Sequence, residues 1–287
     1  MSDAPDTIFD ALRPRLFSMA YRMLGIRAEA EDVVQEAWLR WNASPHDTLQ
    51  SPEAWLVTIV TRLSIDHLRA AKAEREAYTG FWLPEPLVDV DASTPERLAE
   101  QASELSMALM WVLQRLSPEE RAAFVLRQAF DEDYADVAAT LGKSEAACRQ
   151  LVHRAAERVR QERVRFEVPR EAHRTLVERF MHAARAGDRP AMMALFADDV
   201  HLVSDGGGKV PSFGKLISGV QRLANLYYAV WRRHAAEYRA ATINGEPGLL
   251  RYVDGVLESA QAFAIDGGRI AAIYTVRNPD KLARIAA

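Results

Sequence analysis

The feature that most constrains this chain is the stretch Asp133–Arg160, which reads DYADVAATLGKSEAACRQLVHRAAERVR. Its first part repeats apolar residues at the spacing of one helical face, namely Tyr134, Val137, Ala138 and Leu141. Gly142 follows, and glycine tolerates the positive φ at which many helices end. Ser144 can begin a second helix by accepting a hydrogen bond from an unpaired backbone N–H. The stretch therefore predicts two helices joined by a tight turn.

The second predicted helix carries a basic polar face. Its inward stripe is Ala147, Leu151, Ala155 and either Arg158 or Val159, and its other face holds Glu145, Arg149, Gln150, His153 and Arg154. From Gly142 to Arg165 there are seven Lys or Arg against three Glu, a local charge of +4 in a chain of net charge −4. A positive patch on an acidic protein is expected where phosphates are bound, and such a helix suits a DNA major groove. A plain helical hairpin with a solvated basic face is the alternative.

Composition places the chain among globular proteins. It has 287 residues, 49% of them hydrophobic and 26% charged, which is enough for two or three domains with real cores. No apolar run approaches the ~20 residues of a membrane span, and the start of the chain lacks the features of a signal peptide. The single cysteine, Cys148, excludes an internal disulfide and fits a reducing cytoplasm, where we expect it to be a small apolar filler. We expect no membrane association, no cofactor and no metal site.

Residues 7–72 predict three or four helices. In the second, Ala28–Trp41, acidic residues face away from Val33, Val34, Ala37, Trp38 and Trp41. In the third, Ser51 and Pro52 provide a cap and a first turn, and hydroxyls and cations alternate with the apolar positions. Taken alone, both polar faces could be solvated. The alternatives are a protein-binding surface on the second helix and a nucleic-acid surface on the third.

The segments AEAEDVVQEAWLRW and EAWLVTIVTRLSIDHLRAAKA resemble region 2 of bacterial RNA polymerase sigma factors of the extracytoplasmic-function (ECF) type, and the hairpin resembles their region 4. The resemblance covers about residues 7–165. It implies core RNA polymerase and promoter DNA as partners. The polymerase-facing positions would be Asp32, Gln35, Glu36 and Arg40. The positions that read the −10 element would be Arg62, Ser64, Asp66, His67 and Arg69. The positions that read the −35 element would be Lys143, Ser144, Glu145, Ala147, Arg149, Gln150, His153 and Arg154.

The chain changes pattern after Val168-Pro169. Helices are followed by period-two segments and a predicted β-hairpin with its turn at Asp266-Gly267-Gly268, which indicates an α+β cone. This part resembles SnoaL-like domains. DGGGK at 205–209 lacks the spacing of a phosphate-binding P-loop, and no catalytic constellation is evident, so we predict no enzymatic activity.

Three short motifs resemble signatures of the ECF group with a SnoaL-like C-terminal extension: WLPEP at 82–86, DGGGK, and NPDKL at 278–282. The resemblance implies that the extension acts in cis, in place of a separate anti-sigma protein. The regulatory positions would be Trp82, Leu83, Pro84, Asp205, Gly206, Gly207, Gly208, Lys209, Asn278, Pro279 and Asp280. Because large aromatic side chains are costly to leave exposed, we expect residues 81–86 to pack on the cone near the other two motifs.

The sequence therefore predicts a multidomain protein with two all-α sigma domains, a region 2 helical bundle and a region 4 helix-turn-helix, plus an α+β SnoaL-like cone. The expected ranges are 1–75 for region 2, 76–104 for the linker, 105–167 for region 4 and 168–287 for the cone. The expected function is that of a cytoplasmic sigma factor. Two alternatives remain at this point: a one-component DNA-binding regulator with a ligand-binding cone, and a cyclase or isomerase fused to a DNA-binding module.

Overall fold

The computed structural model describes residues 5–46, 49, 51–89, 106–161 and 168–285. They form two compact units, one from Met1–Glu76 and Val112–Arg163 and one from Ala77–Trp111 and Val164–Ala287. The first part of the predicted linker, up to residue 89, thus belongs to the second unit. The rest of the linker, with the boundary expected at 104, lies outside the described residues.

The first unit is helical. Its elements are α1 (Pro5–Leu24), α2 (Arg27–Asn42), α3 (Pro52–Ala70), α4 (Lys72–Glu76), α7 (Pro118–Phe124), the π-helix η2 (Val125–Ala129), α8 (Tyr134–Leu141) and α9 (Glu145–Gln161). The predicted cap at Ser51 is present, and a second helix start is also capped. Ser51 accepts from the backbone N–H of Ala54 at the start of α3. Ser117 and Glu120 form a reciprocal capping box at the start of α7.

The predicted hairpin is α8, a turn at Gly142 with φ 62°, and α9. Ser144 caps α9 by accepting from Ala147 N over 3.2 Å. The buried stripe of α9 is Cys148, Leu151, Val152, Ala155 and Val159. Of the two alternatives at the end of this stripe, Val159 is therefore the buried residue and Arg158 is exposed. Cys148 occupies an apolar position, and burial raises the pKa of its thiol.

Two guanidinium groups tie α7 and its neighbours to the end of α1. The fully buried Arg121 donates to the carbonyl of Met23 and, over 2.9 Å, to Gln114 Oε1. Arg75 donates over 2.8 Å to the same Gln114 oxygen and over 2.8 Å to the carbonyl of Leu24. The last carbonyls of a helix carry partial negative charge and lack intrahelical donors, so they are suitable partners for these cations. The two chain segments of the first unit, Met1–Glu76 and Val112–Arg163, are thereby joined through hydrogen bonds as well as packing.

The second unit is built on a seven-stranded sheet of order β1-β4-β5-β6-β7-β2-β3. Its strands are β1 (Val88–Asp89), β2 (Phe196–Asp205), β3 (Ile217–Ser218), β4 (Ala236–Ile243), β5 (Glu246–Val253), β6 (Val256–Asp266) and β7 (Arg269–Val276). Its helices are α6 (Met107–Leu113), which ends in the first unit, α10 (Arg170–Ala186), α11 (Arg189–Leu195), α12 (Val220–Arg233) and α13 (Pro279–Leu282). All pairings are antiparallel except that of β2 with β7, which is parallel. The predicted β-hairpin is β6–β7, closed by Gly267 and Gly268.

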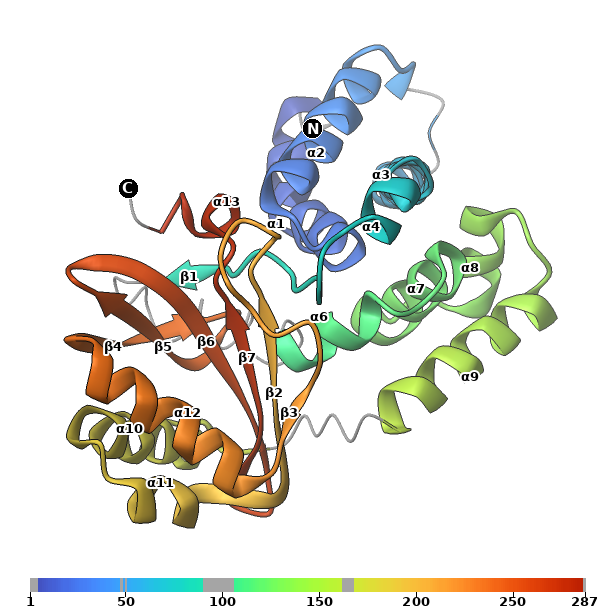
Figure 1. Cartoon of the computed structure of the whole chain (residues 1–287). Coiled ribbons are helices and arrows are strands. Elements are labelled where there is room, and N and C mark those ends of the chain that lie inside the picture. The colour runs from blue at the N-terminus through green and yellow to red at the C-terminus, as the bar shows by residue number, and fades with distance from the viewer. Residues whose placement is uncertain (1–4, 47–48, 50, 90–105, 162–167, 286–287) are drawn as a thin grey trace. The chain divides into compact units, whose positions relative to one another are not determined.

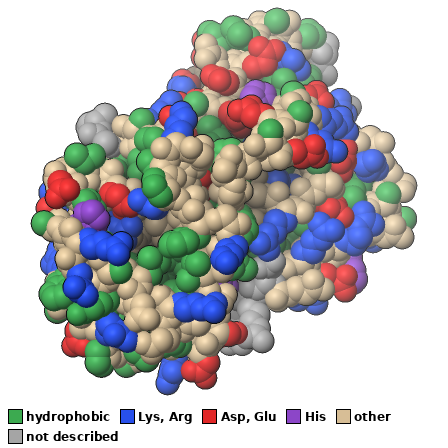
Figure 2. All heavy atoms as spheres, in the orientation of Figure 1, with side chains coloured by type: hydrophobic (Ala, Val, Ile, Leu, Met, Phe, Trp, Pro, Cys, Tyr) green, Lys and Arg blue, Asp and Glu red, His purple; other side chains and the backbone are tan. Residues whose placement is uncertain are grey.

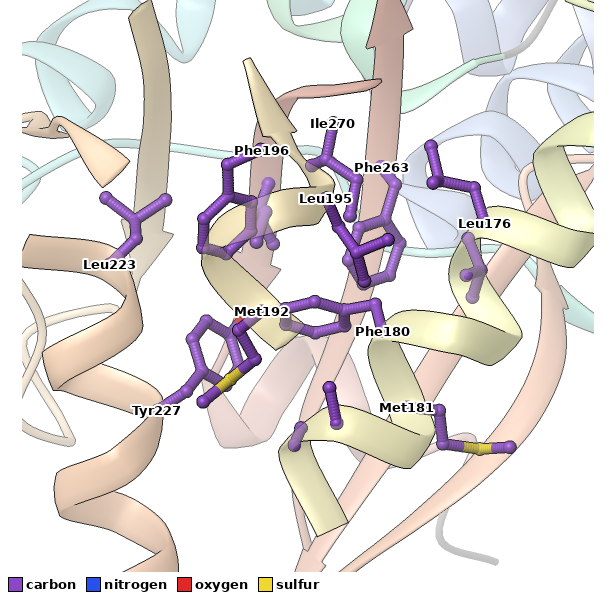
Figure 3. Close-up of a cluster of buried hydrophobic side chains, with 14 of the residues drawn as sticks. Leu176, Phe180, Met181, Met192, Leu195, Phe196, Leu223, Tyr227, Phe263 and Ile270 are labelled. Carbon is purple, nitrogen blue, oxygen red and sulfur yellow. The ribbon is translucent and has the colours of Figure 1, made fainter. Parts of the chain in front are cut away.

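The sheet packs different elements on its two faces (Figure 1). Helices α10, α11 and α12 cover one face, where the ring of Phe180 lies among Phe196, Tyr227 and Phe263 with centroid distances of 5.8, 4.9 and 5.3 Å (Figure 3). The other face is covered by Leu83 of the linker together with α6 and α13. The linker also supplies β1, which the sequence did not predict: Val88 pairs with Ile243 of β4. None of the helices in the described ranges is long and apolar enough to cross a membrane.

Candidate functional site

The carboxylate of Asp205 is the centre of the contact between the linker and the cone. Asp205 ends β2 and is 0% exposed. Its Oδ1 accepts from the hydroxyl of Tyr78 over 2.6 Å and from Gly207 N over 3.0 Å. Its Oδ2 accepts from Leu83 N over 2.9 Å and from Lys281 Nζ over 2.7 Å. We call these residues, together with Asn278, the Asp205 cluster. The predicted contact among the three motifs is therefore present.

Lys281 joins the C-terminal segment to the linker. It is 6% exposed, and its ammonium group donates to the carbonyl of Leu83 over 2.5 Å as well as to Asp205. The same nitrogen lies 4.0 Å from the centroid of the Trp82 ring, which is a favourable cation–π geometry. A buried ammonium group is stable only when its charge is paired and its protons are bonded, and here the linker and Asp205 meet both needs.

Asn278 closes the cluster. Its Nδ2 donates to the hydroxyl of Tyr78 over 2.9 Å, and its backbone N donates to the carbonyl of Asp205 over 2.9 Å. Gly207 packs so closely that an added Cβ would lie 2.4 Å from Asn278 Nδ2. Burial is the main cause that raises the pKa of Tyr78, and the hydrogen bond to Asp205 adds to it, so the hydroxyl stays protonated and can donate. Outside the cluster, Lys209 pairs with Asp280 at the surface.

Tyr78 and Lys281 were not among the predicted site residues. Lys281 lies inside the NPDKL motif, so the motif carried a signal for it, whereas a single tyrosine in a linker carries none. Leu83 and Pro84 of the predicted set are buried. The remaining glycines of DGGGK form the turn that follows β2, in which Lys209 N donates to the carbonyl of Gly206.

The polar face of α9 is exposed, as expected for a surface that binds DNA. Exposed side chains on this helix and its cap include Lys143, Ser144, Glu145, Arg149, Gln150, His153 and Arg154, whereas Ala147 is half-buried. Arg149 pairs with Glu145 over 2.7 Å and lies 4.6 Å from the Tyr134 ring centroid. Arg154 pairs with Glu120 over 2.9 Å. Glu145 is an exchangeable surface partner of Arg149, since a phosphate or a guanine edge offers comparable acceptors, whereas the Glu120 carboxylate that binds Arg154 is buried.

The predicted −10-reading face of α3 contacts other helices of the first unit. Arg62 donates to the carbonyls of Thr140 and Ala139 at the end of α8, over 3.1 and 3.4 Å. Arg69 donates to Glu119 over 2.5 Å. Asp66 and His67 are exposed. Ser64 is 0% exposed and its hydroxyl donates to the carbonyl of Val60, so it presents no atom to a base in this arrangement.

The predicted polymerase-facing residues of α2 lie on its surface. Asp32, Gln35 and Arg40 are exposed and Glu36 is half-buried, with Glu36 and Arg40 paired over 2.9 Å. The grouping of Trp38 with the inward residues was wrong: Trp38 is 40% exposed, whereas Trp41 is buried. Leu39, 51% exposed, lies beside it. Large apolar side chains within a charged surface are characteristic of protein-binding sites.

Comparisons with known proteins bear on these surfaces. The sigma-70 region 2 family matches residues 8–74, and the sigma-70 region 4 family matches residues 106–159. The chain is 40% identical to the ECF RNA polymerase sigma factor SigJ of Mycobacterium tuberculosis, over 95% of this chain and 91% of that protein. The chain belongs to the ECF RNA polymerase sigma factors. A crystal structure of M. tuberculosis SigJ superposes with a TM-score of 0.80 at 37% identity, covering 96% of this chain and 98% of that one.

Sigma factors bind core RNA polymerase and promoter DNA and direct transcription initiation, and they are not enzymes. Membership of this family therefore decides against a fused cyclase or isomerase and against a one-component regulator. The helical sigma regions and the SnoaL-like α+β domain agree with the predicted fold class. A solved structure of the sigma factor RpoE from Bartonella quintana, in complex with the anti-sigma factor NepR, is 21% identical with a TM-score of 0.42 and covers 55% of this chain.

Proposed function

We propose that this sigma factor is regulated in cis by its SnoaL-like domain, and that the Asp205 cluster is the regulatory contact. The observation that carries the proposal is the buried carboxylate of Asp205, which binds the linker through Tyr78 and Leu83 and the C-terminal segment through Lys281. A carboxylate that stays buried with some of its hydrogen bonds broken is costly, whereas one released into water regains its solvation. We therefore expect two states of the contact, docked and released, without a graded series between them.

Chain connectivity gives this contact its effect on the sigma regions. Tyr78 follows the end of α4 at Glu76 by two residues, and Trp111 of α6 packs on the cone immediately before the chain enters the region 4 helices. Both connections to the DNA-binding helices are thus anchored on the cone while the linker is docked. Release of the linker would lengthen the free connection and change the distance over which regions 2 and 4 can separate.

Promoter recognition is assigned to α9 and α3. Arg149, Gln150 and His153 on the exposed face of α9 would contact base edges of the −35 element, while Lys143 and Arg154 would contact phosphates. On α3, Arg62, Asp66, His67 and Arg69 would contact the −10 element. Arg62 and Arg69 are bound to α8 and Glu119, so they would have to leave these partners before reaching DNA.

Core polymerase would bind the face of α2 that carries Asp32, Gln35, Glu36 and Arg40. The exposed Trp38 at the same surface supplies the apolar anchor that a protein interface needs at its centre. A protein that meets polymerase and promoter DNA is expected to work in the cytoplasm. With the Asp205 cluster as the switch, we expect no separate anti-sigma factor.

Transcription in vitro with core polymerase tests the regulation. Gly207→Ala places a Cβ against Asn278, whereas Gly268→Ala, also at positive φ, adds a Cβ that meets nothing within 4 Å. Both variants carry the cost of an alanine at positive φ, so their difference isolates the Asp205 cluster. We expect Gly207→Ala to change promoter output by at least about fivefold, a typical lower value for allosteric coupling, and Gly268→Ala to leave it unchanged. Equal output from the two variants would refute regulation through this contact.

A further inference from the structure

A cavity of about 250 Å³ opens into the second unit between α12 and the sheet. Strands β2, β5, β6 and β7 form its floor, and α12 and the loop that carries Phe213 form its sides. Figure 2 shows hydrophobic side chains gathered in a hollow on this unit, with Lys and Arg side chains around them. Neither the sigma regions nor the Asp205 cluster uses this cavity.

One wall of the cavity holds two cations and one anion. Arg251, 7% exposed, donates to Glu258 through Nε over 2.7 Å and pairs with it through a second nitrogen over 2.6 Å. Arg277 pairs with the other oxygen of Glu258 over 2.5 Å. Burial acts to raise the pKa of Glu258, but the two arginines outweigh it and lower the pKa, so the carboxylate stays ionised. Among the described residues that line the cavity, Glu258 is the sole acid, and the wall keeps one excess positive charge.

The excess charge is not explained by folding alone. A structural ion pair balances one cation with one anion, whereas here Glu258 is shared by the buried Arg251 and by Arg277, whose side chain is 25% exposed. The Nε of Arg277 is buried and has no hydrogen-bond partner in the described part of the chain. An anion bound at this wall would neutralise the excess charge and receive charge-assisted hydrogen bonds from guanidinium donors.

Most of the remaining lining is apolar, and the polar exceptions are Ser204, His234 and Thr275. Phe213, Leu226 and Val230 line its sides, and the ring of Tyr227 lies below them, with its hydroxyl already donating to Gln261 over 3.0 Å. Pockets for organic ligands combine such walls with a few polar groups that fix orientation. The volume lies just below the ~300–1,000 Å³ usual for ligand pockets, which favours a short or single-ring molecule.

We propose that the SnoaL-like domain binds a small organic carboxylate, with its carboxylate on Arg251 and Arg277 and its apolar body against Phe213, Leu226 and Val230. The charge of the wall selects the head group, and the apolar sides select the body.

The cavity is physically connected to the Asp205 cluster, and this step rests on the regulation proposed above. Arg277 lines the cavity with its side chain and donates from its backbone N to the carbonyl of Asp205 over 2.7 Å. Its guanidinium group also donates to the carbonyl of Pro211, in the loop between DGGGK and Phe213. A ligand that draws Arg277 toward its carboxylate would therefore shift the balance between docked and released linker, by as much as its affinities for the two states differ.

Calorimetric titration of the full-length protein with benzoate and hexanoate tests the site, with benzyl alcohol and hexanol as neutral analogues of the same shape. We expect saturable binding of at least one carboxylate and about tenfold to a hundredfold weaker binding after Arg277→Met, the usual effect of losing charge-assisted bonds. Arg239→Met is the matched control, because Arg239 is an exposed cation of the same sheet outside the cavity. Val230→Trp places a larger side chain in the cavity while both arginines are retained, and should abolish binding in a folded protein.

Several results would overturn the site: no saturable binding of either carboxylate, equal affinity for the neutral analogue, or carboxylate binding that survives both Arg277→Met and Val230→Trp. Transcription with and without the bound carboxylate then tests the coupling separately. Binding without any change in promoter output would establish the site and refute its connection to the Asp205 cluster. Failure to bind would leave the comparison of Gly207→Ala with Gly268→Ala unaffected.

Discussion

Replacing Lys281 by Met measures the strength of the contact that holds the linker on the cone. Methionine keeps most of the apolar length of the side chain and removes the ammonium group. Asp205 then retains the donors Tyr78, Leu83 and Gly207 but loses its only charged partner among the described contacts, while it remains fully buried. The carbonyl of Leu83 also loses the ammonium donor.

The expected cost follows from burial. Removing one partner of a buried ion pair destabilises a protein by about 3–5 kcal/mol, because the other charge is left uncompensated. At roughly 2–4 °C per kcal/mol for a unit of this size, Tm of the second unit should fall by roughly 6–20 °C. Adding Asp205→Asn removes the orphaned charge, so the double variant should recover about 0.5–3 kcal/mol relative to the sum of the single changes.

Lys209→Met is the matched control. Lys209 and Asp280 join the same two motifs as Lys281 and Asp205, but their side chains are 54% and 62% exposed. Surface ion pairs contribute about 0–1 kcal/mol, so Tm should barely change. The measurements are thermal unfolding and the hydrogen exchange rate of the Leu83 amide, which donates to Asp205. If Lys281→Met costs less than about 1 kcal/mol, as the control does, the cluster does not hold the linker and the reasoning fails.

Three further outcomes are expected. Trp38→Ala should weaken core polymerase binding by at least ~2 kcal/mol, as for an interface anchor, without lowering Tm, and unchanged affinity in an anisotropy titration would contradict the α2 surface. Arg149→Ala should lose ~1–3 kcal/mol of discrimination at one −35 position, measured by binding to single-base promoter variants, whereas Lys143→Ala should weaken binding evenly across them and flatten its salt dependence. Burial lowers the pKa of His173 to about 4, so as the pH falls the unfolded chain takes up a proton near pH 6.5 before the folded chain does. The contribution of His173 to the free energy of unfolding is therefore complete above pH 6.5 and falls by up to about 3 kcal/mol toward pH 4. Urea titrations of His173→Leu should show a flatter dependence of stability on pH between these values.

Local signals in the sequence predicted the helices and turns well. Ser51, Ser117 and Gly142 act through neighbours within a few residues, so their effects can be read without knowledge of the fold. The same holds for the two-glycine turn between β6 and β7. The exposed face of α9 also follows from helical spacing alone.

Features that depend on distant partners could not be predicted in the same way. Asp205 is charged and precedes three glycines, a pattern typical of an exposed turn. It is nevertheless buried, because it binds Tyr78 and Lys281, which lie far from it in the sequence. The strand at Val88 forms because β4 offers a free edge, which no local pattern reveals. Trp38 fits the apolar spacing of α2 as well as Trp41 does, and only the packing of neighbouring helices shows which of the two is buried.

The parallel pairing of β2 with β7 makes the second unit sensitive to strand length in an uneven way. Asp205 pairs with Val276, so the C-terminal ends of both strands lie next to each other. An insertion in the turn between β6 and β7 lies at the opposite end of β7 and would leave these strand ends unchanged. A one-residue deletion inside β7 would exchange the faces of every side chain beyond it. Arg277 would then leave the cavity, and Lys281 would move out of reach of Asp205. Homologous chains should therefore vary in length at the turns and keep the number of residues from the β7 turn to Lys281 constant.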